Sequence, residues 1–444
     1  MSDTLNLLND LLKYAKTSGA DAADAIYFAS TDVATSVRKG KPENLERAES
    51  TGIGLRVFVG KRPAMVSSTD LSPAALHTAC DRAIAMAKAS LDDPHSGLAP
   101  EHLWPTHIPD LDLCEPNEAD VGWLQSQCKA VEDAALAHQG ITNSEGAEAH
   151  LSRNQIALAT SSGFANHYQT SSCSLSVSVI AGEGDKMERD YAYSVARHTR
   201  DLKAAEGIGR EAAERTLRRL NPQKVSSQTV PIVFEPRIAR AMLSYFASAT
   251  SGSAIARGTS FLKHALHQAI FSPAITIVDD PHIVRGLGSK PFDAEAVANG
   301  RKTLVEKGVL TSWILDMRSA NQLGLTSTGH AVRGIGSAPS PSATNLYIAA
   351  GTHSADALIG EIECGFFVTD AFGMGVNLVT GDYSQGASGM WIENGKLAYP
   401  VSEITIAGHL NDMFKSLTPA NDLTFDYSIN SPTLRIDRMT VAGV

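Results

Sequence analysis

The sequence has little charge and no long hydrophobic run, and both absences narrow the class of protein. Only 19% of its 444 residues are Asp, Glu, Lys or Arg, and the acidic residues outnumber the basic ones by 48 to 38. The formal net charge is −10 and no block of clustered Lys and Arg occurs, so no nucleic acid partner is expected, because binding one needs a basic face. No apolar run reaches the length of about 18 residues that spans a membrane.

Cysteine is also scarce. Five cysteines are present and none forms a C-x-x-C pair: Cys80, Cys114, Cys128, Cys173 and Cys364. An odd number without paired spacing argues against a disulfide framework and against a zinc ribbon. The N-terminal residues lack the basic and apolar segments of a secretory signal. These absences together predict a soluble cytoplasmic protein.

Several common catalytic motifs are missing as well. Neither a G-x-x-x-x-G-K-[ST] phosphate loop nor a G-x-S-x-G nucleophile elbow occurs. None of the 14 histidines is followed by Glu, so the helical H-E-x-x-H motif of zinc hydrolases is absent. His264 and His267 would share one face of a helix, but no carboxylate follows them, and the pair indicates a surface feature rather than a metal site.

The pattern that is present in the first half combines helices with antiparallel strands. Apolar spacing and capping residues predict four helices, at residues 4–17, 72–90, 117–137 and 201–220. Short strands separated by Gly- and Pro-containing turns predict an antiparallel meander over residues 24–69. The strongest alternation of polar and apolar residues is at Ser174–Val179 and predicts a further strand. Residues 92–116 are Pro-rich and predict a surface excursion.

The second half differs in composition, which predicts a second domain. Residues 221–228 form a polar linker and predict a boundary between an N-terminal domain of residues 1–222 and a C-terminal domain of residues 229–444. Two helices are expected after it, at residues 236–249 and 406–417, among many Gly-punctuated strands. The predicted fold class is therefore α+β, with a β-rich C-terminal domain that forms an antiparallel sheet or barrel.

One segment of the second half, residues 373–414, is unusually rich in glycine and small residues. Its pattern predicts a strand, a Gly-rich turn, a strand, a tight turn at Asn394-Gly395, a strand and a helix. Small residues leave the backbone accessible, so an unpaired edge at residues 376–392 could accept an extended peptide by strand addition. The alternative interpretation is a plain hairpin meander.

This segment resembles the TldD/PmbA family, the "modulator of DNA gyrase" proteins. The words N-x-x-T-G-D-Y-S-x-G-A-S-G-x-W-x-E-N-G at residues 377–395 and P-V-S-E-I-T-I-A-G at 400–408 look like the PmbA branch, which is also called TldE. Supporting words are R-G-T-S at 257–260, D-D-P at 279–281 and T-G-x-G-L-R at 51–56. The resemblance covers essentially the whole chain.

The resemblance implies a cytoplasmic bacterial protein with an N-terminal α/β domain, a β-rich C-terminal domain and a tendency to form dimers. In this family, TldD and PmbA act together as a zinc-dependent peptidase on unfolded peptides. The TldD-type subunit carries the zinc, held by H-E-x-x-x-H on a helix and by a cysteine further along the chain. A TldD-type zinc peptidase subunit is thus the partner that the resemblance implies, with a homodimer left open.

The resemblance also implies which residues occupy the zinc positions here. The counterparts of the H-E-x-x-x-H residues are Leu243, Ser244 and Ser248, and residues 382–387, where the cysteine is expected, contain none. We therefore expect no catalytic residue and no metal on this chain, with zinc on the partner. The expected contacts with a peptide or a partner strand are eight residues of the glycine-rich segment: Asn377, Thr380, Gly381, Asp382, Tyr383, Ser384, Gly386 and Ser388.

Three functional hypotheses follow. The first is a non-catalytic subunit that organises substrate or partner in a zinc metallopeptidase complex. The second is an independent hydrolase with a different site, for which Ser384 or Ser388 with His409 or His353 are the candidates, although their spacing supports no triad. The third is an interaction protein that modulates DNA gyrase, for which a charge of −10 without acidic runs is weak support.

Overall fold

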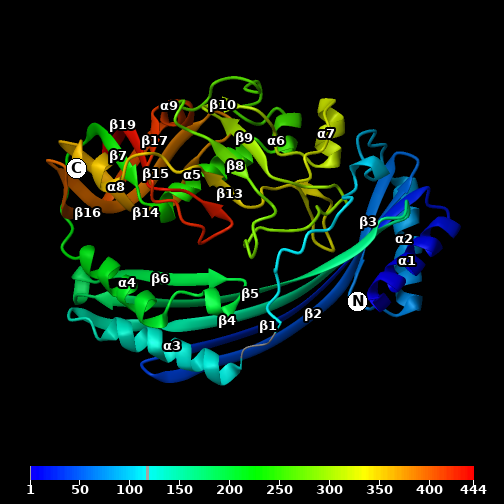
Figure 1. Cartoon of the computed structure of the whole chain (residues 1–444), viewed down its shortest axis with the longest axis horizontal. Helices are drawn as coiled ribbons and strands as arrows, with labels where there is room; N and C mark the ends of the chain where they lie inside the picture. The colour runs from blue at the N-terminus through cyan, green and yellow to red at the C-terminus, as the bar shows by residue number, and fades with distance from the viewer. Residues whose placement is uncertain (1, 117–119) are drawn as a thin grey trace.

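A long curved sheet holds the second half of the chain on its concave side (Figure 1). The computed structural model describes residues 2–116 and 120–444. The sheet has six antiparallel strands in the order β3-β2-β1-β4-β5-β6. Their bounds are β1 Ala22–Arg38, β2 Lys41–Val59, β3 Arg62–Ser68, β4 Ile141–Thr160, β5 Ala165–Ala181 and β6 Glu188–Ala196.

The alternation of side chains along these strands separates two environments. Ala23 and Ala25 of β1 face one side of the sheet and pack in apolar clusters with helices, as does Val177 of β5. Asp24 and Ile26 face the other side, where they meet the second half of the chain. The predicted meander is thus present, with strands longer than expected, and Ser174–Val179 lies within β5 as predicted.

Four helices cover the convex side of the sheet in two pairs. Helices α1 (Ser2–Thr17) and α2 (Pro73–Ala89) pack at one end, and α3 (Val121–Leu136) and α4 (Ala205–Arg218) at the other. The Ser72 hydroxyl caps α2 by accepting a hydrogen bond from the Ala75 N–H, and Pro73 occupies the first turn. The four helices correspond to the predicted ones, although residues 117–119 of the predicted third helix lie outside the described residues.

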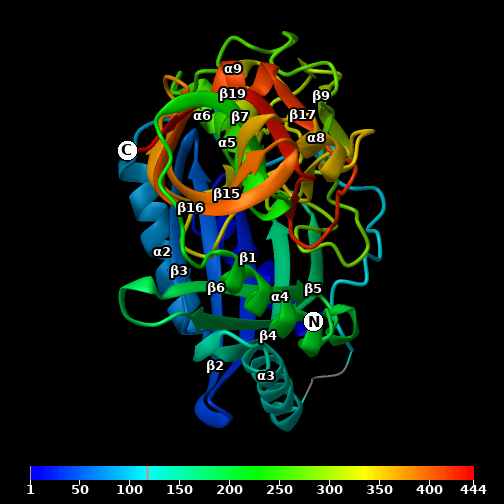
Figure 2. The ribbon, with the colours of Figure 1, turned by 90° about the vertical axis from the view of Figure 1, so that its left-hand side faces the viewer.

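The second half is built around a closed barrel. Strands β7, β14, β15, β16 and β19 pair in the order β16-β15-β14-β7-β19, and β16 also pairs with β19, which closes the ring (Figure 2). Strand β17 (Leu417–Pro419) pairs with the first residues of β19, Leu434–Ile436. The bounds are β7 Gln228–Phe234, β14 Cys364–Val376, β15 Asp382–Glu393, β16 Lys396–His409 and β19 Leu434–Ala442. The predicted α+β class with a barrel-like C-terminal part is confirmed.

Helix α5 (Pro236–Ala249) packs against this barrel and contributes to the largest apolar core, in which Phe234, Phe246, Phe366 and Phe414 are fully buried. A small five-stranded sheet, β10-β9-β8-β13-β18, adjoins it. Its strands are β8 Ile277–Asp279, β9 Lys302–Glu306, β10 Val309–Leu310, β13 Leu346–Ile348 and β18 Ile429–Asn430. The other elements are β11 Ala331–Val332, β12 Ser340–Pro341, α6 Gly252–Ala256, α7 Met317–Leu323, α8 Ala355–Gly360, α9 Leu410–Lys415 and 3-10 turns at Glu101–Leu103, Gly184–Lys186 and Thr199–Asp201.

The expected helix at residues 406–417 is correct only in part. Residues 406–409 are the end of β16 and pair with β15, Ile406 and Ala407 also pair with β19, and the helix is confined to α9. Ile404 and Ile406 are buried in the barrel core, so the alternation of a strand prevails over helical spacing. No helix among the described residues is long and apolar enough to cross a membrane. The boundary at residues 221–228 stays a prediction.

Candidate functional site

The glycine-rich segment contains a tight turn that its own side chains close. The Gly381 N–H donates to the Asn377 carbonyl at 2.7 Å, and the Asn377 N–H donates to the Asp382 carbonyl at 2.9 Å. The Asn377 side-chain oxygen accepts from the Val379 N–H at 2.9 Å, and the Thr380 hydroxyl donates to the Asp382 carboxylate at 2.6 Å. The sequence word N-x-x-T-G-D thus encodes a turn whose polar groups satisfy one another.

His409 joins this turn to the start of α9 through its two ring nitrogens. Its Nε2 lies 3.0 Å from the Thr380 carbonyl oxygen, and its Nδ1 accepts a hydrogen bond from the Asn411 N–H at 3.3 Å. Gly381 has a φ of +95°, and a Cβ at this position would lie 2.8 Å from the His409 ring. Because Nδ1 accepts, the ring proton is on Nε2 and points to a carbonyl, so His409 is held as a packing and capping group.

The two serines considered as nucleophiles lack a histidine partner within the described part of the chain. Ser384 is exposed on the outer surface of the barrel, and Ser388 is buried. Neither hydroxyl forms a hydrogen bond with a described histidine, and the backbone of His353 pairs instead with Ala420 and Asn421. The hydrolase hypothesis therefore gains no catalytic geometry from these residues.

Strand β15, which carries most of the predicted contact residues, has no free edge. It pairs with β14 from Tyr383 to Glu393 and with β16 from Asp382 to Glu393. Both ladders are antiparallel and enclose the strand within the barrel wall. This corrects the expectation of an unpaired edge at residues 376–392. Contact of a peptide or partner with the exposed side chains of Thr380, Asp382 and Ser384 stays a prediction.

The structure brings the start of β15 next to helix α5. The ring of Tyr383 is buried and lies 6.2 Å from the ring of Tyr245, centroid to centroid. Burial raises the pKa of both phenol groups. On the opposite side of β15, the Phe372 ring covers Gly386 so closely that a Cβ there would lie 2.3 Å from a ring carbon. The region is therefore filled by aromatic packing.

The three positions that the resemblance assigns to the zinc motif lie on α5 and differ in their surroundings. Leu243 is 1% exposed and belongs to the apolar core. The Ser244 hydroxyl donates to the Arg240 carbonyl at 3.4 Å, and Ser248 is exposed. Zinc takes nitrogen, sulfur and carboxylate ligands, so these three side chains do not fit the ion. No group of three or more His, Cys, Asp or Glu among residues 2–116 and 120–444 could hold a metal ion.

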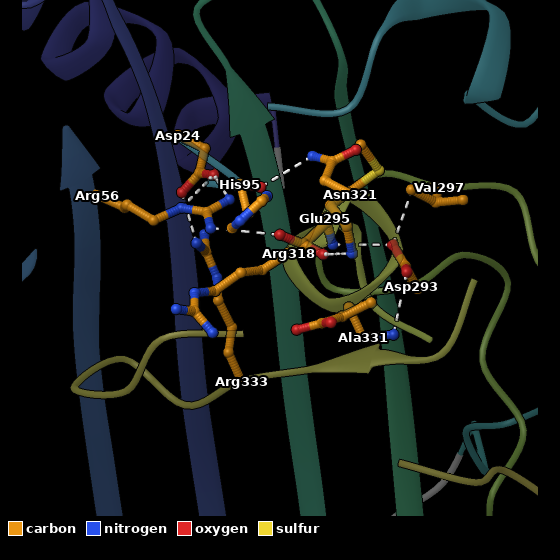
Figure 3. A network of polar contacts seen from close by, with 12 residues as sticks. Asp24, Arg56, His95, Asp293, Glu295, Val297, Arg318, Asn321, Ala331 and Arg333 are labelled. Atoms are coloured by element: carbon orange, nitrogen blue, oxygen red, sulfur yellow. Dashed lines mark hydrogen bonds and ion pairs between the residues drawn. The ribbon is translucent and has the colours of Figure 1, made fainter. Parts of the chain in front are cut away.

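A buried cluster of charged side chains lies elsewhere, between the concave face of the sheet and the second half (Figure 3). Arg56 of β2 donates through Nε to Asp24 of β1 at 3.0 Å and through Nη1 to Glu295 at 3.3 Å. Arg333 donates through Nη1 to the other oxygen of Asp24 at 2.5 Å. All four side chains are 5% exposed or less. We call Asp24, Arg56, Glu295 and Arg333 the interface network.

Burial and charge act against each other on the two acids of the network. Burial alone would raise the pKa of Asp24, but the charges of Arg333 and Arg56 outweigh it and lower that pKa. Glu295 has the opposite balance, since burial outweighs the charge of Arg56 and raises its pKa to about 7. Its other oxygen accepts from the Met317 N–H at 2.8 Å, at the start of α7. The network thereby joins the sheet to a helix of the second half.

A neighbouring acid orders the loop that carries Glu295. Asp293 accepts hydrogen bonds from the Glu295 and Val297 N–H groups at 2.9 and 2.8 Å, and from the Ala331 N–H at 3.0 Å (Figure 3). Burial raises the pKa of Asp293. These contacts fix the loop against β11, so Glu295 reaches Arg56 from a rigid support.

The sequence motif T-G-x-G-L-R at residues 51–56 explains how the second half of the chain approaches strand β2 so closely. A Cβ at Gly54 would lie 2.2 Å from the carbonyl oxygen of Ile335, so only glycine lets that backbone lie on the strand. Arg56 follows two residues later on the same face and forms the ion pairs. Sequence reasoning did not assign this site, although the Gly-x-Gly-Leu-Arg pattern on a predicted strand was the signal.

A cavity of about 420 Å³ adjoins the interface network. Its walls combine apolar groups of the concave face with the loops of the second half, among them Ile26, Phe28, Tyr168, Phe292 and Ile335. Two cations in its wall, Lys290 and Arg197, donate to backbone carbonyls, Lys290 to Ala331 at 3.0 Å. Burial lowers the pKa of both cations. The cavity can accept an apolar side chain.

Comparison with known proteins places the whole chain in one family. Three family profiles match in order: the PmbA/TldA metallopeptidase domain 1 at residues 23–87, the central domain at 114–220 and the C-terminal domain at 227–443. The protein described as Metalloprotease PmbA from Escherichia coli O157:H7 is 37% identical over 426 residues, which cover 96% of this chain and 93% of that protein.

Solved structures agree with the sequence relatives. A protein from Bacteroides thetaiotaomicron described as a "putative modulator of DNA gyrase" superposes with a TM-score of 0.92 at 29% identity, over 100% of both chains. TldE from Thermococcus kodakarensis superposes with a TM-score of 0.86 at 21% identity, over 98% of this chain and 100% of that one, and shares the fold. The chain therefore belongs to the PmbA/TldD metallopeptidase family.

Proposed function

We propose that this chain is the non-catalytic subunit of a zinc metallopeptidase complex that acts on unfolded peptides, with the zinc held by a TldD-type partner. The proposal rests on the residues that this chain, a member of the family, has at the positions assigned to the zinc motif. Leu243, Ser244 and Ser248 supply no nitrogen, sulfur or carboxylate ligand, and such ligands are what a catalytic zinc requires.

The packing around these positions supports a role other than metal binding. Leu243 contributes its whole side chain to the apolar core, and Tyr383 occupies the adjoining part of β15. A metal site needs polar ligands that converge on one open point. In this chain Leu243 is buried in the apolar core and Ser248 is exposed, so these side chains do not converge, as expected for a region that has kept its fold and lost its chemistry.

The surface beside this region fits contact with another chain. Phe372, Met374 and Val379 are 52%, 101% and 57% exposed, close in sequence to the exposed polar residues Thr380 and Asp382. Exposed apolar side chains next to a rigid polar turn are typical of an interaction surface. We assign this surface to the TldD-type partner or to the peptide that the complex holds.

The test compares the chain alone, a TldD-type relative with H-E-x-x-x-H alone, and the two co-purified. We expect cleavage of an unfolded peptide and bound zinc only where the relative is present, with greater activity for the pair. Ser384→Ala in the chain alone tests the alternative of an independent hydrolase. Robust cleavage by this chain alone, lost in Ser384→Ala, would overturn the proposal in favour of an independent hydrolase.

A further inference from the structure

Arg197, which directly follows β6, lies in the wall of the cavity beside the interface network and has no acidic partner there. Its guanidinium donates to the backbone carbonyls of Gly286, Leu287 and Ser171 at 3.3, 2.5 and 3.1 Å, and it forms no ion pair within the described part of the chain. Burial lowers its pKa, but arginine stays charged in proteins. A partly buried cation whose partners are all neutral is a favourable place for an anion.

The described residues that line this cavity carry more positive than negative charge. The cations are Arg197, Lys290 and Arg333, and the acid is Asp293. Asp24, which does not line the cavity, pairs with Arg333 through Nη1, while Nε and Nη2 of Arg333 are buried without a hydrogen-bond partner among the described residues. Asp293 already accepts from three backbone N–H groups. Donors therefore exceed acceptors on this wall, and the remaining charge attracts an anion.

Two side chains of the wall have hydrogen-bond donors to spare. Lys290 donates to the Ala331 carbonyl at 3.0 Å, which uses one of the three N–H groups of an ammonium. The hydroxyl of Tyr168 forms no hydrogen bond within the described part of the chain. Burial raises the pKa of this phenol to about 12, while the nearby charge of Arg197 lowers it, so the hydroxyl keeps its proton and lies within electrostatic reach of that cation.

The loop between the two cations is fixed by a buried amide. The side-chain oxygen of Asn345 accepts from the Gly288 N–H at 2.8 Å, and its side-chain nitrogen donates to the Ser289 hydroxyl at 2.7 Å. Arg197 binds the beginning of this loop and Lys290 stands at its end. One supported segment thus holds both cations, and a preorganised site loses little entropy when it binds.

The rest of the wall is largely apolar. Ile26 and Phe28 come from the concave face of the sheet, and Ile335 comes from the second half. The Phe292 ring packs edge to face on the ring of Tyr168, with 5.4 Å between their centroids. The volume of about 420 Å³ is in the range of sites for small molecules, which combine apolar walls with a few polar groups.

We propose that this cavity binds a small monocarboxylate that has an apolar body and no amino group. Arg197, Lys290 and the Tyr168 hydroxyl hold the carboxylate through charge-assisted hydrogen bonds, and Phe28 and Phe292 contact the apolar body. The same cations repel an ammonium group, which disfavours free amino acids. None of the described residues that line the cavity lies on α5 or β15, so the inference does not depend on the proposed function.

The test measures binding of hydrocinnamate to the full chain by isothermal titration calorimetry. We expect saturable binding of one molecule per chain. The amide of the same acid, which keeps the shape and lacks the charge, should bind about tenfold more weakly or worse, and so should phenylalanine and acetate. Absence of saturable binding, or equal affinity for the acid and its amide, would overturn the proposal. Binding of N-acetyl-Ala-Ala-Phe but not of hydrocinnamate would overturn the assignment to a small acid.

Variants locate the site within the chain. Tyr168→Phe removes a hydroxyl that has no described partner, so it should keep the wild-type Tm and weaken hydrocinnamate binding about five- to tenfold. Arg197→Gln should weaken it about tenfold or more, and Lys290→Gln, which disturbs one backbone contact only, gives a second test if Arg197→Gln does not fold. Arg218→Gln, at an exposed position of α4, is the matched control and should bind like wild type. Wild-type affinity in Tyr168→Phe and Lys290→Gln would overturn the proposal.

Discussion

Two regions of this protein differ in where their chemistry-bearing side chains lie. The region of α5 and the start of β15, where we propose that the family's zinc motif has its counterpart, holds Leu243, two serines and the edge-to-face pair of Tyr245 and Tyr383. The interface network holds two arginines and two acids, all buried. The charged groups of the interface network thus join the two halves, while the region of α5 and β15 contributes apolar packing.

The comparison shows that the two regions are held together by different forces. Apolar packing of Leu243 and Tyr383 maintains the helix and the strand. A buried ion pair tolerates loss poorly, since removal of one partner leaves the other charged and buried. Substitutions in the two regions should therefore differ in size and in dependence on pH.

The largest effect is expected from Arg56→Met. This change leaves Asp24 with only Arg333 and leaves Glu295 without its cation, so the free energy of unfolding should fall by about 3–5 kcal/mol. Urea denaturation followed by circular dichroism measures it. Arg47→Met, which removes the exposed pair with Glu49, is the control and should cost under about 1 kcal/mol. Equal losses in both variants would contradict the role of the interface network.

A somewhat smaller effect is expected in the motif region. Leu243→Ala should lower the free energy of unfolding by about 2–4 kcal/mol, because it opens a cavity in the core. Ser248→Ala, one turn away on the exposed face, should change it by less than about 0.5 kcal/mol. The same denaturation measurement separates the two variants. A negligible cost for Leu243→Ala would show that this part of α5 is not held by packing.

The smallest effect is expected from titration of Glu295. Its pKa rises from 4.5 to about 7 on folding, so between these values the folded state binds more protons than the unfolded state. The free energy of unfolding should therefore fall as pH rises from about 4.5 to about 7, by at most about 3 kcal/mol. Asp24, whose pKa is lowered from 3.8, acts in the opposite direction and at lower pH.

The measurement is a series of denaturation curves between pH 4.5 and 7.5 for wild type, Glu295→Gln and Glu43→Gln. The first variant should remove most of the decline, and the second, at an exposed position, should keep it. A wild-type profile that rises through this range would contradict the direction of the Glu295 shift.

Local patterns predicted much of the fold. The caps at Ser72 and Pro73, and the alternation at Ser174–Val179, depend on neighbouring residues only, and the structure contains both features. The lengths of β1 and β2 were underestimated, because the exposed residues 41–51 carry no apolar alternation. The barrel end of β16 was taken for a helix, since its pairing with β19 is a long-range contact.

The local turn of the candidate site could be predicted from the sequence, but the side chains that pack around it from distant parts of the chain could not. The turn word at residues 377–382 is local, and its hydrogen bonds follow from the residue types. The pairing of Arg56 with Glu295 joins positions 239 residues apart, which spacing along one sequence does not show. The pairing of Tyr383 with Tyr245 is of the same kind.

The central claim is that this chain has no zinc site of its own, and metal content tests it most directly. The isolated chain and a TldD-type relative are each equilibrated with excess zinc, passed through gel filtration and analysed for bound metal. We predict about one zinc per chain for the relative and well below one for this chain. About one tightly held zinc per chain in this protein, unaffected by a brief exposure to chelator, would contradict the claim.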